Sequence, residues 1–355
     1  MADLLSPAAF GALSLRNRLV MAPMTRSRAD ADGGATELMV EYYRQRATAG
    51  LVVTEGIAPS EVGKGYCRTP VLDGPQSVAG WRAITDAVHA EGGTIVAQVM
   101  HCGRIAHADN KAPGADTVAP SAIRAAGQMY TDTAGMEPFE EPRELSSSEI
   151  PVVVDEYRRF ASLAVDAGFD GVELHGTSGY LPAQFLSTGT NRRTDGYGGS
   201  TDARVRFPVE VLQAMAAEIG ADRLGLRICP GNPFNDLEDA DVEDTFRTFL
   251  TAIRSMRLAY LHVIRLHDGG LDNLALARGL HDGPLIVNDS YGLAEAGTAI
   301  ADAACDAVSF ARLYISNPDL VARVAGNLPL TAFDPRSLYL QGPAGYTDYP
   351  TAVNS

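Results

Sequence analysis

The chain has 355 residues, of which 46% are hydrophobic and 21% are charged. That composition is ordinary for a globular protein, and the length suits one large α/β barrel or two smaller domains. The formal net charge of −15 argues against nucleic acid or an anionic membrane as a partner.

Short apolar runs alternate along the chain with longer amphipathic segments, a pattern typical of repeated βα units. The predicted strands are Leu19–Met24, Leu51–Glu55, Thr94–Val99, Gly171–His175, Leu224–Cys229, Tyr260–Ile264, Pro284–Asn288 and Ala307–Ala311. The predicted helices are Thr36–Ala47, Ser77–Ala90, Ile150–Ala167, Asp202–Ile219, Val242–Ser255, Leu271–Gly279, Leu293–Asp302 and Asn317–Gly326. This alternation predicts an α/β fold, a (β/α)8 TIM barrel that forms a single domain over residues 1–355.

A doubly wound sheet is the alternative fold. It would require a glycine-rich phosphate turn after an early strand, and the first strand instead ends in Pro23-Met24-Thr25.

Two segments fall outside the βα rhythm. Residues 101–149 are too long and too rich in Pro, Gly and Ser for a simple connection, so we expect a capping or lid excursion on the catalytic face. We expect the tail, residues 328–355, to fold back over the barrel.

Targeting and redox signals are weak. No apolar run approaches the length of a membrane helix, and Met1–Leu5 lacks the basic and apolar regions of a signal peptide. The cysteines Cys67, Cys102, Cys229 and Cys305 are scattered, and His101, Cys102 and His107 match no common metal-ligand spacing. We therefore expect no metal and a reduced, cytoplasmic protein.

Polar residues follow several of the predicted strands, and active sites of TIM barrels lie at the carboxyl ends of the strands. Thr25 follows the first strand, Gln98 lies in the third, His175 ends the fourth and Arg227 lies in the fifth. The loops after strands seven and eight often bind phosphate in such barrels, and here they contain Ser290 and Arg312. A phosphate on one side and Thr, Gln and Arg donors across the mouth fit a flavin mononucleotide (FMN) lying on the strand ends.

The segment after strand four contains the most specific pattern. His175, Ser178 and Tyr180 lie within six residues of one another, and a His and a Tyr together are able to hold a carbonyl oxygen and deliver a proton. The same segment continues through Gln184–Ser187, Asn191–Asp195 and Tyr197–Gly199.

These residues resemble the Old Yellow Enzyme family, the FMN-dependent ene-reductases, and the resemblance runs almost end to end. Its other motifs are Asn17-Arg18, Ala22–Arg26, Tyr42–Ala47, Gly63–Tyr66, Gln98 with His101 and Gly103-Arg104, Pro142-Arg143, Arg312, Asn317–Leu320 and Gly345–Pro350. Each motif alone is weak, whereas their order and spacing together are strong. Thr25, where another subgroup has Cys, places the chain with the classical subgroup.

The resemblance implies a role for each site residue. Thr25 would bond to the flavin O4 atom, Gln98 would reach the pyrimidine edge, and Arg227 would lie near N1 and O2. Gly56 would let the backbone approach the ring, and Arg312 would bind the phosphate. The implied cofactor-binding set is Pro23, Thr25, Gly56, Gln98, Arg227, Ser290, Ala311 and Arg312, and the implied substrate-binding set is Tyr66, Met100, His175, Ser178 and Tyr346.

The implied reaction has two halves. NADPH or NADH delivers hydride to tightly bound FMN, and an activated alkene such as an enone, enal or nitroalkene then enters the same site. His175 would stabilise the charge that builds on the substrate oxygen, and Tyr180 would protonate the α-carbon. Each role has a plain structural alternative: a satisfied strand-end histidine, a packing tyrosine, ion-pairing arginines, a capping Thr25 or a core amide at Gln98.

The chain departs from the family pattern at several positions. Ser178 stands where His or Asn usually provides a second donor to the substrate oxygen, and an oxyanion donor is worth on the order of 3 kcal/mol. Met100 stands at a position where Trp is common. Both departures suggest a bulkier substrate, such as a natural-product intermediate. The family prefers glycine-rich turns near Asp289-Ser290 and a glycine before Arg312, where this chain has Ala311. An added carboxylate near a phosphate is unfavourable, which predicts either weaker FMN binding or a re-routed loop.

Two other functions stay open from the sequence. One is a redox-neutral flavin-dependent isomerase that uses Tyr180 as a proton shuttle, and the other is a flavin-free, ligand-binding barrel. Nicotinamide preference is not determined, and either a monomer or a homodimer is expected.

Overall fold

The computed structural model describes residues 3–266 and 270–352, so the first two residues of the N-terminal stretch and the last three of the tail lie outside it. Eight parallel strands form a closed barrel in the order β10-β11-β12-β13-β14-β3-β4-β5. These strands are β3 (Leu19–Met21), β4 (Leu51–Ile57), β5 (Ile95–Val99), β10 (Gly171–His175), β11 (Leu224–Ile228), β12 (Tyr260–Ile264), β13 (Leu285–Asn288) and β14 (Ala307–Phe310). The predicted TIM barrel is confirmed.

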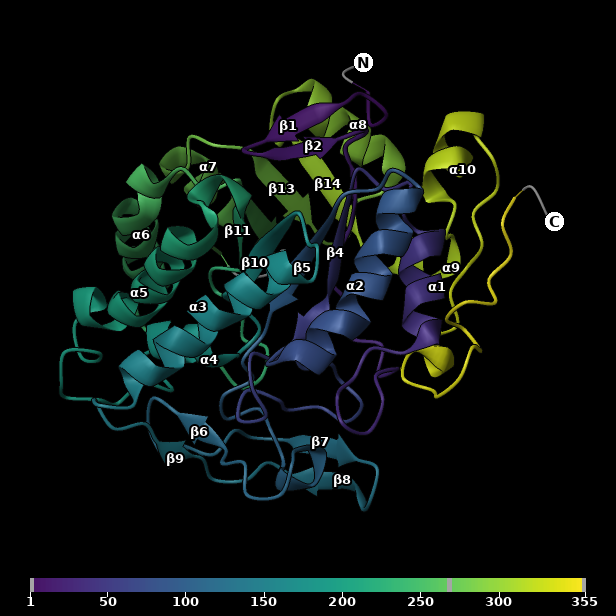
Figure 1. Ribbon diagram of the computed structural model, residues 1–355. Helices are drawn as coiled ribbons and strands as arrows, with labels where there is room; N and C mark the ends of the chain where they lie inside the picture. Colours follow the sequence, from purple (N-terminus) through teal and green to yellow (C-terminus); the bar gives the residue numbers. More distant parts are fainter. Residues whose placement is uncertain (1–2, 267–269, 353–355) are drawn as a thin grey trace.

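Helices surround this barrel (Figure 1). They are α1 (Glu37–Gln45), α2 (Pro75–Ala90), α3 (Ile150–Asp166), α4 (Leu181–Leu186), α5 (Thr201–Ile219), α6 (Val242–Ile253), α7 (Asn273–Leu280), α8 (Leu293–Ala301), α9 (Arg312–Ser316) and α10 (Leu320–Gly326). Helices α4 and α9 were not predicted, because five or six residues are too few to show a helical period. Helix α1 begins after Thr36, whose side chain accepts a hydrogen bond from the Met39 amide.

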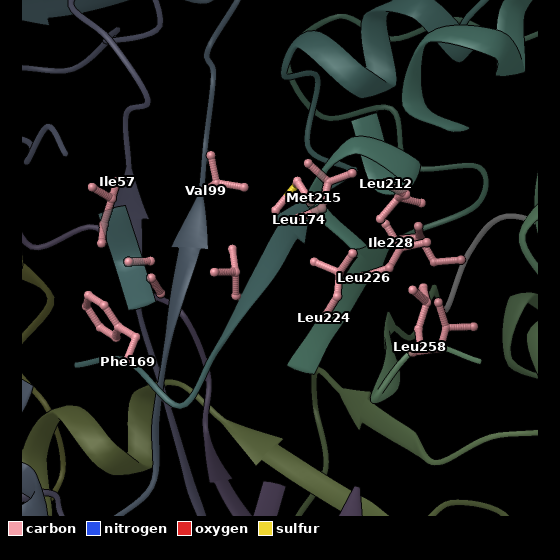
Figure 2. Packing of buried hydrophobic residues seen from close by; sticks show 14 of the residues in the cluster. Ile57, Val99, Phe169, Leu174, Leu212, Met215, Leu224, Leu226, Ile228 and Leu258 are labelled. Carbon is pink, nitrogen blue, oxygen red and sulfur yellow. The ribbon is translucent and has the colours of Figure 1, made fainter. Parts of the chain in front are cut away.

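Side chains alternate between the helix layer and the barrel interior along each strand. Figure 2 shows Leu226 and Ile228 of β11 on the side that faces Leu212 and Met215 of α5, within the main apolar cluster. Arg227, between them, therefore points into the barrel. The same alternation directs the polar residues of neighbouring strands to the barrel axis.

The barrel interior has an apolar layer near the amino ends of the strands. It contains Val20, Leu51, Val53, Val96, Tyr260, Ile286 and Ala307. An antiparallel hairpin of β1 (Ala8–Phe10) and β2 (Leu13–Leu15) packs Phe10 and Leu13 against this layer. The hairpin closes this end of the barrel and leaves the opposite end for the functional site (Figure 1).

The predicted excursion, residues 101–149, contains two small sheets at the carboxyl end of the barrel, opposite β1 and β2 (Figure 1). Strands β6 (Val118–Ala119) and β9 (Arg143–Glu144) pair in parallel, and β7 (Gln128–Thr131) and β8 (Gly135–Pro138) form an antiparallel hairpin.

The tail after α10 lies against α1 and the loop after β3. Arg26 Nη2 donates to the Gly345 carbonyl at 2.7 Å, and Arg28 Nη1 donates to the Leu338 carbonyl at 2.7 Å. No helix in the described part of the chain is long and apolar enough to cross a membrane.

Candidate active site

Strand register brings the predicted residues to one end of the barrel. Gln98 of β5 pairs with Glu173 of β10, and His175 of β10 pairs with Arg227 of β11. Arg227 pairs in turn with His262 of β12. The polar side chains of these strands therefore meet across the carboxyl half of the barrel, as expected for an active site of this fold.

His175 is a buried, neutral imidazole. It is 8% exposed, and its Nδ1 atom has no hydrogen-bond partner among the described residues. Burial, together with the charge of Arg227, lowers the pKa of His175 to about 3. A neutral imidazole with an unpaired ring nitrogen has hydrogen-bonding capacity left for a ligand.

Tyr180 lies beside His175, with ring centroids 4.8 Å apart and the rings nearly perpendicular. It precedes α4 as the N-cap residue and is 7% exposed. Its hydroxyl is 3.0 Å from the hydroxyl of Tyr66. Burial raises the pKa of Tyr180 well above its ordinary value and also raises that of Tyr66, so both phenols keep their protons at neutral pH.

Ser178 and Gly179 turn the chain between His175 and Tyr180. Both adopt left-handed backbone conformations, with φ of 59° and 76°. Asn235 holds the turn, because its Nδ2 atom donates to the Ser178 carbonyl at 2.8 Å. This turn brings Tyr180 back against His175. A non-glycine residue with positive φ is uncommon and here accompanies the predicted site.

A cavity of about 680 Å³ opens beside Tyr180. Thr25, Tyr66 and Tyr180 are the predicted site residues that line it, and its apolar wall includes Met129, Phe139, Phe234, Tyr339 and Leu340. Its volume lies within the usual range for small-molecule sites. The excursion and the tail thus both contribute to the wall. None of these apolar wall residues was predicted from the sequence.

The tail tyrosine that lines the cavity is Tyr339, whereas Tyr346, predicted for the substrate site, is not among the lining residues. Tyr346 is completely buried, its ring stacks on Tyr42 at a centroid distance of 4.0 Å, and the Arg28 guanidinium lies 4.8 Å from its centre. Tyr346 therefore anchors the tail. Tyr339 is 59% exposed, and its only sequence signal was its place in the tail.

Met100 does not border this cavity either. It is 3% exposed and belongs to a buried cluster with Cys102 and Tyr180, against which the partly buried Tyr66 packs. A Cβ atom added at Gly56 would lie 2.5 Å from the Met100 sulfur. The absence of a side chain at Gly56 therefore leaves room for the Met100 side chain.

Two predicted donors at the mouth have no partner among the described residues, which fits a bound FMN. The side chains of Thr25 and Arg312 make no hydrogen bond or ion pair within the described residues, and Arg312 is exposed. Asp289 and Ser290 have φ of 76° and 58°, conformations that favour glycine. The backbone of this loop thus adopts conformations typical of glycine, although neither residue is a glycine. Ala311 precedes α9 as its N-cap residue, and Pro23 is half-buried after β3.

Comparisons with known proteins agree with this fold. Residues 3–331 match the NADH:flavin oxidoreductase / NADH oxidase family. The chain is 40% identical to a probable flavin mononucleotide-dependent alkene reductase of Leishmania infantum, over 98% of this chain and 97% of that protein. It is 36% identical to 12-oxophytodienoate reductase 1 of Oryza sativa subsp. japonica, over 98% and 92%.

Solved structures show the same similarity. The old yellow enzyme homologue from Zymomonas mobilis superposes with a TM-score of 0.95 at 36% identity, over 98% of this chain and 99% of that one. A morphinone reductase in complex with tetrahydroNAD has a TM-score of 0.93 at 39% identity, over 98% and 97%. Barrel, donors and relatives together define an FMN-dependent oxidoreductase. The chain belongs to the Old Yellow Enzyme family.

Proposed function

We propose that this protein reduces the activated C=C bond of α,β-unsaturated carbonyl compounds, with NADPH or NADH as the hydride source. The observation that supports this most directly is the contact between His175 and Tyr180, with ring centroids 4.8 Å apart, beside a cavity of about 680 Å³. This pair offers a donor for a carbonyl oxygen and a phenol that stays protonated at neutral pH.

The cofactor site would use residues from across the mouth. Thr25, Gln98 and Arg227 would hold the isoalloxazine ring, and Arg312 with the 289–290 loop would hold the phosphate. Pro23, Gly56, Ser290 and Ala311 would contribute close backbone contacts. A bound FMN would supply the hydride-transfer chemistry between the nicotinamide and the alkene.

The protein's own part in the chemistry is binding and proton transfer. The imidazole of His175 would donate a hydrogen bond to the substrate oxygen as negative charge builds there. The hydroxyl of Tyr180 would give its proton to the α-carbon. Tyr66, 3.0 Å from Tyr180, would donate a hydrogen bond to the phenolate oxygen that results.

The apolar wall favours a bulky substrate. Met129 and Phe139 of the excursion and Phe234 and Tyr339 extend the cavity beyond the tyrosine pair. Ser178 is shorter than the donor expected at its position, so the substrate oxygen would rely mainly on His175. We therefore propose a large activated alkene, such as a natural-product intermediate, as the physiological substrate.

Anaerobic spectroscopy of the purified protein tests this function. Flavin absorption that bleaches with NADPH and returns with an α,β-unsaturated ketone would support it. Bleaching without reoxidation by any enone, together with substrate isomerisation that consumes no NADPH, would favour a redox-neutral isomerase. A colourless protein that cannot be reconstituted with FMN would favour the flavin-free barrel.

We also propose a cytoplasmic location. Cys67, Cys102, Cys229 and Cys305 are all buried and unpaired, which suits a reducing compartment. Among the residues with described positions, no group of three His, Cys, Asp or Glu side chains is arranged to hold a metal ion.

A further inference from the structure

A polar layer fills the barrel interior just below its mouth, above the apolar layer that the β1–β2 hairpin closes. Its members are the inward-pointing residues Gln98, Glu173, Arg227, His262, Asn288 and Ser309, each from a different strand. All six are at most 7% exposed. Burying so many polar groups costs free energy unless they are paired, so their arrangement needs an explanation.

Glu173 connects two other members of this layer. One carboxylate oxygen accepts a hydrogen bond from Gln98 Nε2 at 2.8 Å, and the other is 2.9 Å from His262 Nδ1. A carboxylate only accepts, so Nδ1 of His262 carries the proton. Nε2 of His262 then accepts from the Ser309 hydroxyl at 2.8 Å.

Arg227 completes the layer. Its Nη1 lies 3.2 Å from His262 Nε2, and its Nη2 donates to Asn288 Oδ1 at 2.8 Å. Burial and the nearby guanidinium lower the pKa of His262 to about 4, so this histidine is neutral. Burial alone would raise the pKa of Glu173, but His262, Arg227 and Gln98 hold it below its ordinary value. The layer therefore contains one positive and one negative charge.

This pairing also orients the Gln98 amide. Because Nε2 donates to Glu173, the amide group has a defined direction and its oxygen is left as an acceptor. Among the described residues, no hydrogen bond to that oxygen is formed. An acceptor in this position suits the N–H group of a pyrimidine ring above it.

We propose that Glu173 is a positioning residue for FMN, one that orients the Gln98 amide and offsets the charge of Arg227, thereby lowering the midpoint potential of the bound flavin. The inference rests on the proposed contacts of Gln98 and Arg227 with the cofactor. A negative charge near the ring disfavours the extra negative charge of reduced FMN. A purely structural Glu173 would affect both oxidation states equally.

The test is the midpoint potential of FMN in a Glu173→Gln variant, measured anaerobically against a reference dye. Glutamine is nearly isosteric and removes the charge. We expect reduced FMN to gain about tenfold in affinity relative to oxidised FMN, which raises the potential by about 30 mV. A potential unchanged from wild type, or lowered, would overturn the proposal.

Two further variants sharpen the test. Ser309→Ala removes a hydrogen bond to His262 without changing charge. The affinity of this variant for reduced FMN relative to oxidised FMN should therefore stay within twofold of wild type. A shift in midpoint potential equal to that of Glu173→Gln would overturn the charge argument. Asn288→Asp adds a carboxylate on the other side of Arg227 and should lower the potential. If Glu173→Gln does not fold, Asn288→Asp provides the test instead, and an unchanged midpoint potential in that variant would overturn the proposal.

The wild-type measurement separates this inference from the proposed function. A wild-type protein that binds no FMN would refute both. A wild-type protein that binds FMN and reduces enones, beside a Glu173→Gln variant of unchanged potential, would refute the role of Glu173 alone.

Discussion

The hydrogen bond between Tyr66 and Tyr180 leads to a quantitative prediction. When Tyr180 gives up its proton, negative charge develops on its oxygen, and the Tyr66 hydroxyl at 3.0 Å is placed to donate to it. A hydrogen bond to a charged group is worth about 1.5–3 kcal/mol, against about 0.5–1.5 kcal/mol for a neutral one. Tyr66→Phe should therefore raise the barrier to protonation by about 1–2 kcal/mol, which slows it by about 5- to 30-fold.

The assay separates the two half-reactions by anaerobic stopped-flow absorption. Flavin bleaching by NADPH should keep its wild-type rate in Tyr66→Phe, since no proton passes through Tyr180 in that step. Flavin reoxidation by an enone should be slower by the stated factor.

A double-mutant cycle provides the control. In a Tyr180→Phe background, Tyr66→Phe should have little additional effect, because the hydroxyl that Tyr66 supports is already absent. Equal slowing of both half-reactions, or an undiminished effect of Tyr66→Phe in the Tyr180→Phe background, would refute the reasoning.

Four further outcomes are expected. Ser178→Asn should raise kcat/KM for a small cyclic enone by about tenfold, since asparagine tolerates the φ of 59° there and supplies a second donor; no increase in steady-state assays would contradict this. Asp289→Gly should tighten FMN binding in fluorescence titrations, because it removes a carboxylate near the proposed phosphate site and relieves a φ of 76°, and weaker binding would argue against a phosphate there. Tyr346→Ala should destabilise the protein by about 3–5 kcal/mol in urea unfolding, whereas Tyr346→Phe should be nearly neutral because the hydroxyl has no hydrogen-bond partner in the described residues. The rate of flavin reoxidation should be independent of pH between about 5 and 9, because the pKa of His175 is lowered to about 3 and that of Tyr180 is raised, so neither group titrates there; a transition near pH 6.5 would show that His175 is not held neutral.

Local pattern was sufficient to predict the barrel. Strands β10 and β12 have the predicted bounds because each is a short segment with buried Val and Leu between two amphipathic segments, a pattern that needs no distant information to recognise. The error at β3 has a local cause as well. This strand ends at Met21, three residues before its predicted end, near Pro23, which has no N–H to donate to a ladder.

The polar strand-end residues were also predictable, because the carboxyl ends of parallel strands in a closed barrel meet at one face. Once Gln98, His175 and Arg227 were placed on their strands, their convergence followed from the fold. His262 and Glu173 were missed as members of the site. A histidine within an apolar run gives no sign, without the barrel register, that it faces a carboxylate two strands away.

The sequence by itself therefore determined the barrel, the face that carries the candidate site and the residues at the ends of the strands. All of these depend on local periodicity and a fixed topology. Only the tertiary structure decided which tyrosine of the tail reaches the cavity. Tyr339 and Tyr346 differ by seven positions in a segment without regular structure, and their roles depend on Arg26 and Arg28, which are more than 300 residues away in the chain and bond to carbonyls of the tail. Tertiary structure likewise decided that Glu173 pairs with Gln98 on the adjacent strand and with His262 two strands away, because hydrogen bonds across the barrel interior depend on register and leave no mark in the local pattern.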